Sequence, residues 1–372
     1  MKKTSKKIYL TIFRLLCLIM SFIFIVFIPT MPLEVNDNLE RIYSIFSGEK
    51  TDYNGLIEIW NIDSFEGGIK SKSSFLNSVA ASFQKKYKGV YVLVRNITET
   101  ECENMLLQGQ KPDLFSCSYG VSLKIQDYLQ PFSITNKNVY DNLLNAGKGA
   151  DGQIYGLSWC LGLYYLISTK SFLSNAGVVY DENFSLIEKV FSLGYVKNGK
   201  KQKNIYSVTF ANKGYILPKK SVFSYNNNGT NLISNLSFNI NQSLSQYDAY
   251  IDFLLGNSVV LLGSQRDVFR INNREINGKI HDVLIEPVLT SSNLVQFMFL
   301  SRCEDLTKLE YTQKFVSMLT GESVQKLLND YGMFSVLKNL KLSYHNQNLN
   351  IITTDDLSKL KIDNIFDDLQ LN

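Results

Sequence analysis

The sequence predicts an α/β protein built as two lobes, each a mainly parallel sheet flanked by helices. Its 372 residues are 45% hydrophobic, which is enough apolar material for two domains of ordinary size. Between residues 56 and 116, apolar runs rich in β-forming residues alternate with stretches of helical periodicity. This alternation is typical of parallel sheets with right-handed crossovers, which bind ligands beyond the carboxyl ends of their strands.

The first 33 residues are predicted to be an export leader that holds the protein at the membrane. Four lysines come first, and an apolar run from Leu15 to Ile28 follows, interrupted only by Ser21. Extended back to Ile8, the run reaches 21 residues, about the length that a bilayer-spanning helix requires. The lysines would keep the N-terminus inside.

The end of the leader leaves two interpretations open. The exit from the apolar run lacks the small residues of a cleavage site, which favours an uncleaved anchor over a signal peptide with a weak site. Cys17 follows Leu16 in the middle of the run, where lipid attachment is not expected. Either interpretation places residues 55–372 outside the cytoplasm, and a persistent anchor would attach them to the outer face of the cytoplasmic membrane.

The polar and charged residues 34–54 are expected to form a linker. After it, β-rich apolar runs predict strands at 56–62, 90–94 and 114–116. Helical periodicity predicts helices at 73–87 and 99–107, the first of them capped by Ser71 or Ser73. Ligand contacts in such a sheet would come from the loops beyond the strand ends, at 61–71 and 116–120.

The rest of the chain shows weaker patterns. The dipeptide Asn198–Gly199 predicts an exposed hairpin across residues 197–203, and the polar cluster at 226–229 predicts another turn. Further on, periodicity predicts a helix, a strand and one long helix ended by Gly332, at 247–255, 259–262 and 311–328.

Charge and composition exclude several classes of protein. Outside the leader, 33 basic residues face 34 acidic ones, so the chain lacks the basic face that nucleic-acid binding requires. The five cysteines are widely spaced without a C-x-x-C pair, which indicates buried free thiols rather than a metal site, although export leaves disulfides open. No cofactor-binding or nucleophile motif occurs, so neither a cofactor nor Ser–His chemistry is expected.

Four segments occur in a recognisable order: the loop Ile59–Gly68, the Pro-Asp strand Lys111–Ser116, the Tyr-Gly-Leu-Ser-Trp strand with the helix after it at Ile154–Gly177, and Phe253–Arg266 continuing to Thr320. Together they resemble the extracellular solute-binding proteins of ABC importers, especially the sugar-binding group that includes maltose-binding protein. The first loop is similar to the corresponding loop of a subgroup found in low-GC Gram-positive bacteria. Ser158 replaces the usual proline and Gln265 a common cleft tryptophan, which puts the substrate in doubt more than the fold.

The resemblance implies a type II periplasmic-binding-protein architecture, in which two lobes close on a ligand about a hinge. Lobe 1 would comprise residues 55–163 and 288–334, and lobe 2 residues 164–287 and 335–372. The implied partners are a small molecule, expected to be a sugar, and the subunits of an ABC permease. A monomer without enzymatic activity is the family's usual form.

Candidate ligand contacts follow from the resemblance and from the chemistry of sugar recognition, which combines aromatic faces with planar polar groups. The first loop contributes Trp60, Asp63 and Glu66. The other candidates lie at the end of the third strand, at the crossing between lobes and in the second lobe: Ser116, Tyr119, Trp159, Tyr164, Tyr165, Gln265 and Arg266. One or two of the three aromatic residues at the crossing would reach the ligand while the rest pack the hinge.

The principal candidates also have structural interpretations. Trp60 falls within a strand and suits the core equally well. Asp63 and Glu66 could cap a helix or pair with a nearby lysine. Arg266 suits a carboxylate, a phosphate or an acidic sugar, but could instead pair with a neighbouring carboxylate such as Asp267.

Three other functions stay open on the sequence alone. A glycosidase could use Asp63 and Glu66 as its acid and base. A membrane-anchored sensor would report ligand binding to a kinase or receptor instead of a permease. A degenerate cleft would leave a protein that binds only a partner.

Overall fold

The computed structural model describes residues 49–134, 136–179, 185–186, 196–197, 204–211 and 240–367. The leader with Cys17, most of the expected linker, the tip of the expected hairpin and the turn at 226–229 lie outside this part. The chain divides into two units, residues 1–51 with 85–88 and residues 52–84 with 89–372. In the first unit, the Thr51 hydroxyl donates to the carbonyl of Lys88 at 2.6 Å. The second unit carries both lobes and the site described below.

The first sheet has the strand order β2-β1-β3-β12-β4, with β5 beside β12. Its strands are β1 (Glu49–Asn61), β2 (Tyr87–Asn96), β3 (Leu114–Cys117), β4 (Leu129–Gln130), β5 (Gly156–Leu161) and β12 (Val295–Ser301). β1 and β3 are parallel, whereas β12 is antiparallel to β3, β4 and β5. β12 comes late in the sequence, yet it lies between β3 and β4 in the sheet that the N-terminal strands form.

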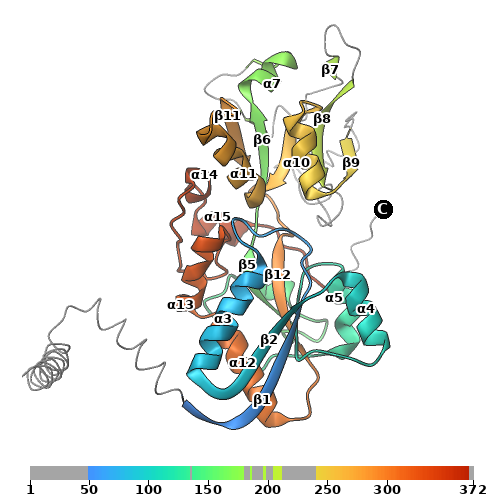
Figure 1. Ribbon diagram of the computed structural model, residues 1–372, viewed down its shortest axis with the longest axis vertical. Helices are drawn as coiled ribbons and strands as arrows, with labels where there is room; N and C mark the ends of the chain where they lie inside the picture. Colours follow the sequence, from blue (N-terminus) through green and yellow to red (C-terminus); the bar gives the residue numbers. More distant parts are fainter. Residues whose placement is uncertain are drawn as a thin grey trace, which may run out of the picture. The chain divides into compact units, whose positions relative to one another are not determined.

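Helices pack against this first sheet. They are α3 (Lys72–Lys86), α4 (Glu99–Leu107), α5 (Val121–Ile125) with the 3₁₀ turn η2 (Gln126–Tyr128), α6 (Asp141–Ala146), α12 (Leu306–Leu319) and α13 (Glu322–Lys326) with η4 (Leu327–Tyr331). Figure 1 shows α3 beside α12, where the rings of Phe83 and Phe315 meet edge-on at 5.4 Å. α3 buries Phe75, Leu76 and Val79 at the helical spacing that its sequence predicts.

The second sheet has the order β11-β6-β10-β8-β7, with β9 beside β8. Its strands are β6 (Tyr164–Thr169), β7 (Val196–Lys197), β8 (Asn204–Ala211), β9 (Ile240–Leu244), β10 (Ser258–Ser264) and β11 (Val283–Pro287), and its helices are α7 (Lys170–Asn175), α10 (Gln246–Leu254) and α11 (Gln265–Ile276). β8 is parallel to β9 and β10, and β6 is antiparallel to β10 and β11. β7 pairs antiparallel with β8, as expected for the arms of a hairpin.

The crossing between lobes is closely hydrogen-bonded. β5 passes into β6 through Gly162 and Leu163, and the chain returns between β11 and β12. Gly162 N–H donates to the carbonyl of Leu294 at 2.6 Å, and the Ser292 hydroxyl donates to the carbonyl of Gly162 at 2.8 Å. Leu163 N–H donates to Oε1 of Gln265 at 3.1 Å. The two crossing segments therefore bond to each other and to the start of α11.

Two expected boundaries differ from the structure. β1 begins at Glu49, inside the expected linker, and Tyr53 there stacks on Tyr311 of α12 at 5.9 Å. The long helix expected over 311–328 begins earlier and is interrupted at Thr320 and Gly321 before α13. Gly332 ends η4 with φ of 65°, a left-handed conformation that suits glycine.

The C-terminal segment, which is expected to belong to lobe 2, also forms hydrogen bonds to the first lobe. It includes α14 (Gln347–Asn350) and α15 (Thr354–Lys359). Its carbonyls accept hydrogen bonds from the first-lobe side: Tyr119 Oη donates to Asp363 at 2.7 Å and the Ser122 hydroxyl to Ile365 at 2.8 Å. Ile365 N–H in turn donates to Ala146 at 2.9 Å. Because residues 119–146 satisfy these groups, the end of the described chain stabilises lobe 1.

The described residues contain no helix long and apolar enough to span a membrane. Within the same part of the chain, no group of three His, Cys, Asp or Glu side chains could hold a metal ion. The four described cysteines are free thiols; Cys102, Cys117 and Cys160 are buried as expected, whereas Cys303 is only partly buried.

Candidate functional site

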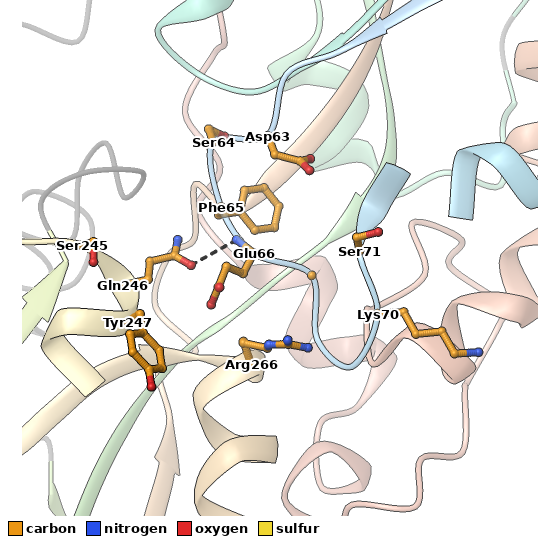
Figure 2. A pocket seen from close by; sticks show the side chains of 11 residues that line it. Asp63, Ser64, Phe65, Glu66, Lys70, Ser71, Ser245, Gln246, Tyr247 and Arg266 are labelled. Atoms are coloured by element: carbon orange, nitrogen blue, oxygen red, sulfur yellow. Dashed lines mark hydrogen bonds between the residues drawn. The ribbon is translucent and has the colours of Figure 1, made fainter. Parts of the chain in front are cut away.

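A cavity of about 400 Å³ lies where the loop between β1 and α3 meets the starts of α10 and α11 (Figure 2). It combines two carboxylates, two cations, two aromatic rings and several small polar groups. The lining residues are Asp63, Ser64, Phe65, Glu66, Gly67, Lys70, Ser71, Ser245, Gln246, Tyr247 and Arg266. Residues of both lobes therefore line the same cavity, as is required when two lobes close on a ligand about a hinge.

A buried lysine holds the first-lobe wall of the cavity in place. Lys72 is 1% exposed, and its ammonium lies 3.4 Å from the centre of the Phe65 ring and 3.4 Å from a carboxylate oxygen of Asp63. It also donates to Oε1 of Gln296 on β12 at 2.8 Å. Burial lowers the pKa of Lys72, and the Asp63 carboxylate opposes that shift. Lys72 thus ties two cavity residues to the central strand of the first sheet.

The second-lobe wall is joined to the loop through Glu66. Its backbone N–H donates to Oε1 of Gln246 at 3.2 Å, as Figure 2 shows. Its carboxylate pairs with Arg270 of α11 at 3.0 Å. Arg270 also contacts Asp267 at 3.1 Å. Burial raises the pKa of Asp267 to about 6, against the opposing effects of the Ser264 N–H and Arg270. Arg270 therefore bridges Glu66 of the loop and Asp267 of its own helix.

The loop meets the rest of the protein through a tight glycine contact. Arg266 Nη1 donates to the carbonyl of Gly68 at 3.0 Å and to that of Ile69. A Cβ on Gly68 would lie 2.2 Å from the carbonyl oxygen of Gly332. One on Gly332 would lie 2.4 Å from the Phe269 ring of α11. Only hydrogen atoms fit at these positions, so the glycines set how closely the loop, η4 and α11 approach.

We expect Gly68→Ala to destabilise the protein by about 1–3 kcal/mol, because backbone cannot yield to the added methyl group as a flexible side chain could. Urea denaturation would measure this loss. Gly109→Ala is the matched control, since Gly109 has φ of 76° and no atom within 4 Å of an added Cβ, and should cost only about 1 kcal/mol of backbone strain. Equal losses in the two variants would contradict the tight contact at Gly68.

Beneath the loop, buried polar groups bond to one another. The Ser116 hydroxyl donates to Oδ1 of Asn61 at 2.9 Å and accepts from Nε1 of Trp159 at 3.3 Å. Gln296 Nε2 donates to Ser116 at 3.1 Å, and Asn61 Nδ2 donates to Asn96 at 2.6 Å. These groups lie at the carboxyl ends of β1 and β3, where the sequence predicts ligand contacts. In the structure these groups instead form hydrogen bonds with other residues of the protein.

The structure brings three of the ten predicted contact residues to the cavity: Asp63, Glu66 and Arg266. The other seven are at most 1% exposed: Trp60, Ser116, Tyr119, Trp159, Tyr164, Tyr165 and Gln265. Trp159 stacks on Phe75 at 5.5 Å, and Tyr164 Oη donates to Asn293 at 2.6 Å. Their side chains fill the core and the crossing between lobes instead of lining the cavity.

Several residues that line the cavity were not individually predicted as ligand contacts. The loop 61–71, predicted as a ligand-binding loop, supplies seven of the eleven lining residues, whereas the loop 116–120 supplies none. Gln246 and Tyr247 line the cavity without having been predicted as ligand contacts. A sequence pattern that marks their position is the capping box of α10, in which Ser245 and Asp248 bond each other's backbone. The capping box shows that a helix begins at these residues.

Two α/β lobes, joined by crossing strands and sharing a cavity between their loops, define the two-domain periplasmic-binding-protein fold. Comparison with solved structures confirms this fold. A putative oligosaccharide periplasmic-binding protein from Synechococcus sp. MITs9220, in complex with zinc, has a TM-score of 0.59 at 10% identity, over 83% of this chain and 88% of that one. The sugar-binding protein MalE from Xanthomonas citri has a TM-score of 0.55 at 14% identity, over 83% and 87%.

The same fold also carries other ligands. Iron-bound HitA from Pseudomonas aeruginosa has a TM-score of 0.52 at 10% identity, over 82% of this chain and 95% of that one. No protein-family model and no curated protein sequence matches this chain. At these identities the likeness establishes the architecture, and the ligand has to be inferred from the cavity.

Proposed function

We propose that the protein is an extracytoplasmic carbohydrate-binding protein that delivers its ligand to an ABC permease by closure of its two lobes. The observation that carries the proposal is the composition of the shared cavity. Tyr247 offers an aromatic face for the apolar side of a sugar ring, and Asp63, Gln246 and three serines offer planar or hydroxyl partners for its hydroxyl groups. Solved proteins of this fold that are described as sugar-binding support it.

The cavity favours binding over catalysis. Glycoside hydrolysis needs two carboxyl groups that are available to the scissile bond. Here Asp63 contacts Lys72 and Glu66 is paired with Arg270. We therefore infer that the protein is not a glycosidase, and we expect no turnover of chromogenic glycosides by the purified protein. Turnover that Asp63→Asn abolishes would contradict this inference.

A thermal-shift screen of the purified full-length protein tests the carbohydrate proposal. The panel should contain mono- and oligosaccharides, polyols, sugar phosphates, amino acids and ferric iron. A sugar at 100 times its Kd should add about 2.7 kcal/mol to the free energy of unfolding and raise Tm. A rise in Tm with amino acids or iron alone, or with no compound, would refute a carbohydrate ligand.

Tyr247→Ala is expected to weaken sugar binding about tenfold, which corresponds to 1.4 kcal/mol. The ring is 56% exposed, so its loss should change the free energy of unfolding by less than about 1 kcal/mol. Calorimetric titration of the folded variant separates the two effects. Unchanged sugar affinity would remove Tyr247 from the site.

We further propose that residues 1–33 hold the protein at the outer face of the cytoplasmic membrane. The run of lysines before a mainly apolar stretch, in which Arg14 near the cytoplasmic end is the one charged residue, supports this placement. In cells, the full-length protein should sediment with membranes after an alkaline wash and be digested by external protease. A transport role predicts that deleting the protein abolishes uptake of the sugar found in the screen, whereas a sensor would leave uptake intact.

A further inference from the structure

Arg266 has binding capacity that the protein itself does not use. Only its Nη1 donates, to two loop carbonyls, and no carboxylate among the described residues pairs with it. The neighbouring acidic groups are engaged elsewhere: Asp267 contacts Arg270 at 3.1 Å, and Glu275 Oε1 accepts from the N–H of Val283 at 3.3 Å. Among the described residues, the Nε and Nη2 donors of Arg266 therefore have no partner at the wall of the cavity.

The charges around the cavity differ in whether they have a partner of opposite charge. Glu66 is paired with Arg270, and Asp63 lies beside Lys72. The ammonium of Lys70 lies 5.0 Å from the centre of the Tyr331 ring and has no ion pair among the described residues. Among the described residues, the carboxylates near the cavity are all engaged: Asp63 contacts Lys72, Glu66 and Asp267 contact Arg270, and Asp248 accepts from Ser245.

We propose that the ligand is an anionic carbohydrate whose carboxylate or phosphate group binds Arg266. This inference rests on the proposed carbohydrate function. A guanidinium held by two carbonyls is oriented in advance, and its remaining N–H donors form the fork that matches an oxyanion. Figure 2 shows Arg266 and Tyr247 along the wall that the second lobe supplies. The acidic group would bind Arg266 while the sugar ring packs on Tyr247.

Calorimetric titration of the full-length protein with matched ligand pairs tests the inference. One pair is an oligosaccharide of neutral sugars and its uronic-acid counterpart, and the other is a hexose and its phosphate ester. We expect at least one acidic member to bind tenfold or more tightly than its neutral partner, and to lose affinity as salt rises from 50 to 500 mM. The pair that shows the preference identifies the acidic group.

Three variants assign the effect to Arg266. Arg266→Gln should weaken binding of the acidic ligand at least tenfold more than binding of its neutral partner, and Arg266→Lys should restore part of the difference. Arg274→Gln is the matched control, because Arg274 lies two turns further along α11, bonded to Tyr250, and does not line the cavity. It should leave binding of both ligands unchanged. Melting curves recorded without ligand check that the variants remain folded.

The outcomes separate the two proposals. If neutral and acidic sugars bind equally, or if Arg266→Gln weakens both to the same extent, the anionic ligand is refuted and the carbohydrate function stands. If no sugar of either kind binds, the carbohydrate function itself is refuted.

Discussion

Replacing Trp60 with alanine is expected to lower the free energy of unfolding by about 3–5 kcal/mol, the usual loss for a large aromatic core residue. The side chain is 1% exposed, and its ring meets Phe115 edge-on at 5.8 Å. Its Nε1 donates to the Glu58 carboxylate at 2.9 Å. Truncation would leave a cavity in the first sheet and remove one of two donors to Oε1 of Glu58, the other being Arg95 at 3.0 Å. Urea denaturation followed by far-UV circular dichroism measures the loss.

Two further variants show whether Trp60 acts through the core. Trp60→Phe keeps most of the apolar volume and loses the N–H donor, so we expect a loss of only about 1–2 kcal/mol. Tyr247→Ala removes an exposed aromatic ring and should cost less than about 1 kcal/mol. A Trp60→Ala protein with unchanged stability and no sugar binding would show instead that Trp60 is a ligand contact.

Lys72→Ala is expected to lower the free energy of unfolding by about 3 kcal/mol or more, because it breaks a buried charge cluster and opens a cavity. The carboxylate of Asp63 would lose its cation and Oε1 of Gln296 its donor. Lys72→Met keeps the length of the side chain and removes the buried charge, so it should lose clearly less. Equal losses in the two variants would show that the volume of Lys72 contributes nothing.

The stability of the wild-type protein relative to Lys72→Met should rise with pH on the alkaline side. Burial lowers the pKa of Lys72 below its ordinary value of 10.5, so between the folded pKa and 10.5 the unfolded chain binds more protons than the folded one. In that window, raising the pH favours the folded wild type. Buried tyrosines titrate in both proteins and cancel in the difference. Urea titrations of both proteins at several pH values measure it, and a difference that falls or stays flat would contradict the assignment.

Much of the fold could be predicted from local patterns. α4 has the bounds that its periodicity predicts, and α10 and β10 lie within one or two residues of theirs. Ser71 accepts from the N–H of Ser74 as the expected cap of α3. The helix expected over 311–328 is interrupted because Thr320 and Gly321 end α12, although the apolar spacing continues into α13. Periodicity alone does not detect such a break.

The candidate site was less predictable, and the reason is physical. Asp63, Glu66 and Arg266 belong to segments whose position at the ends of strands or the start of a helix could be inferred from the chain itself. Whether an aromatic or polar side chain faces the cavity depends on neighbours that are distant in the sequence. Trp159 and Gln265 have the chemistry of ligand contacts, yet remote segments bury both of them.

The sequence by itself predicted most strands and helices and the loop 61–71, because periodicities and turn residues act over a few positions. The order of its motifs implied two lobes through the resemblance to solute-binding proteins. Only the tertiary structure decided which charges around that loop compensate each other. Lys72 joins Asp63 to Gln296 across more than 200 residues, and Arg270 joins α11 to Glu66. Arg266 is left with open donors because these long-range pairs use the nearby carboxylates, and charge pairing of this kind depends on distances in space.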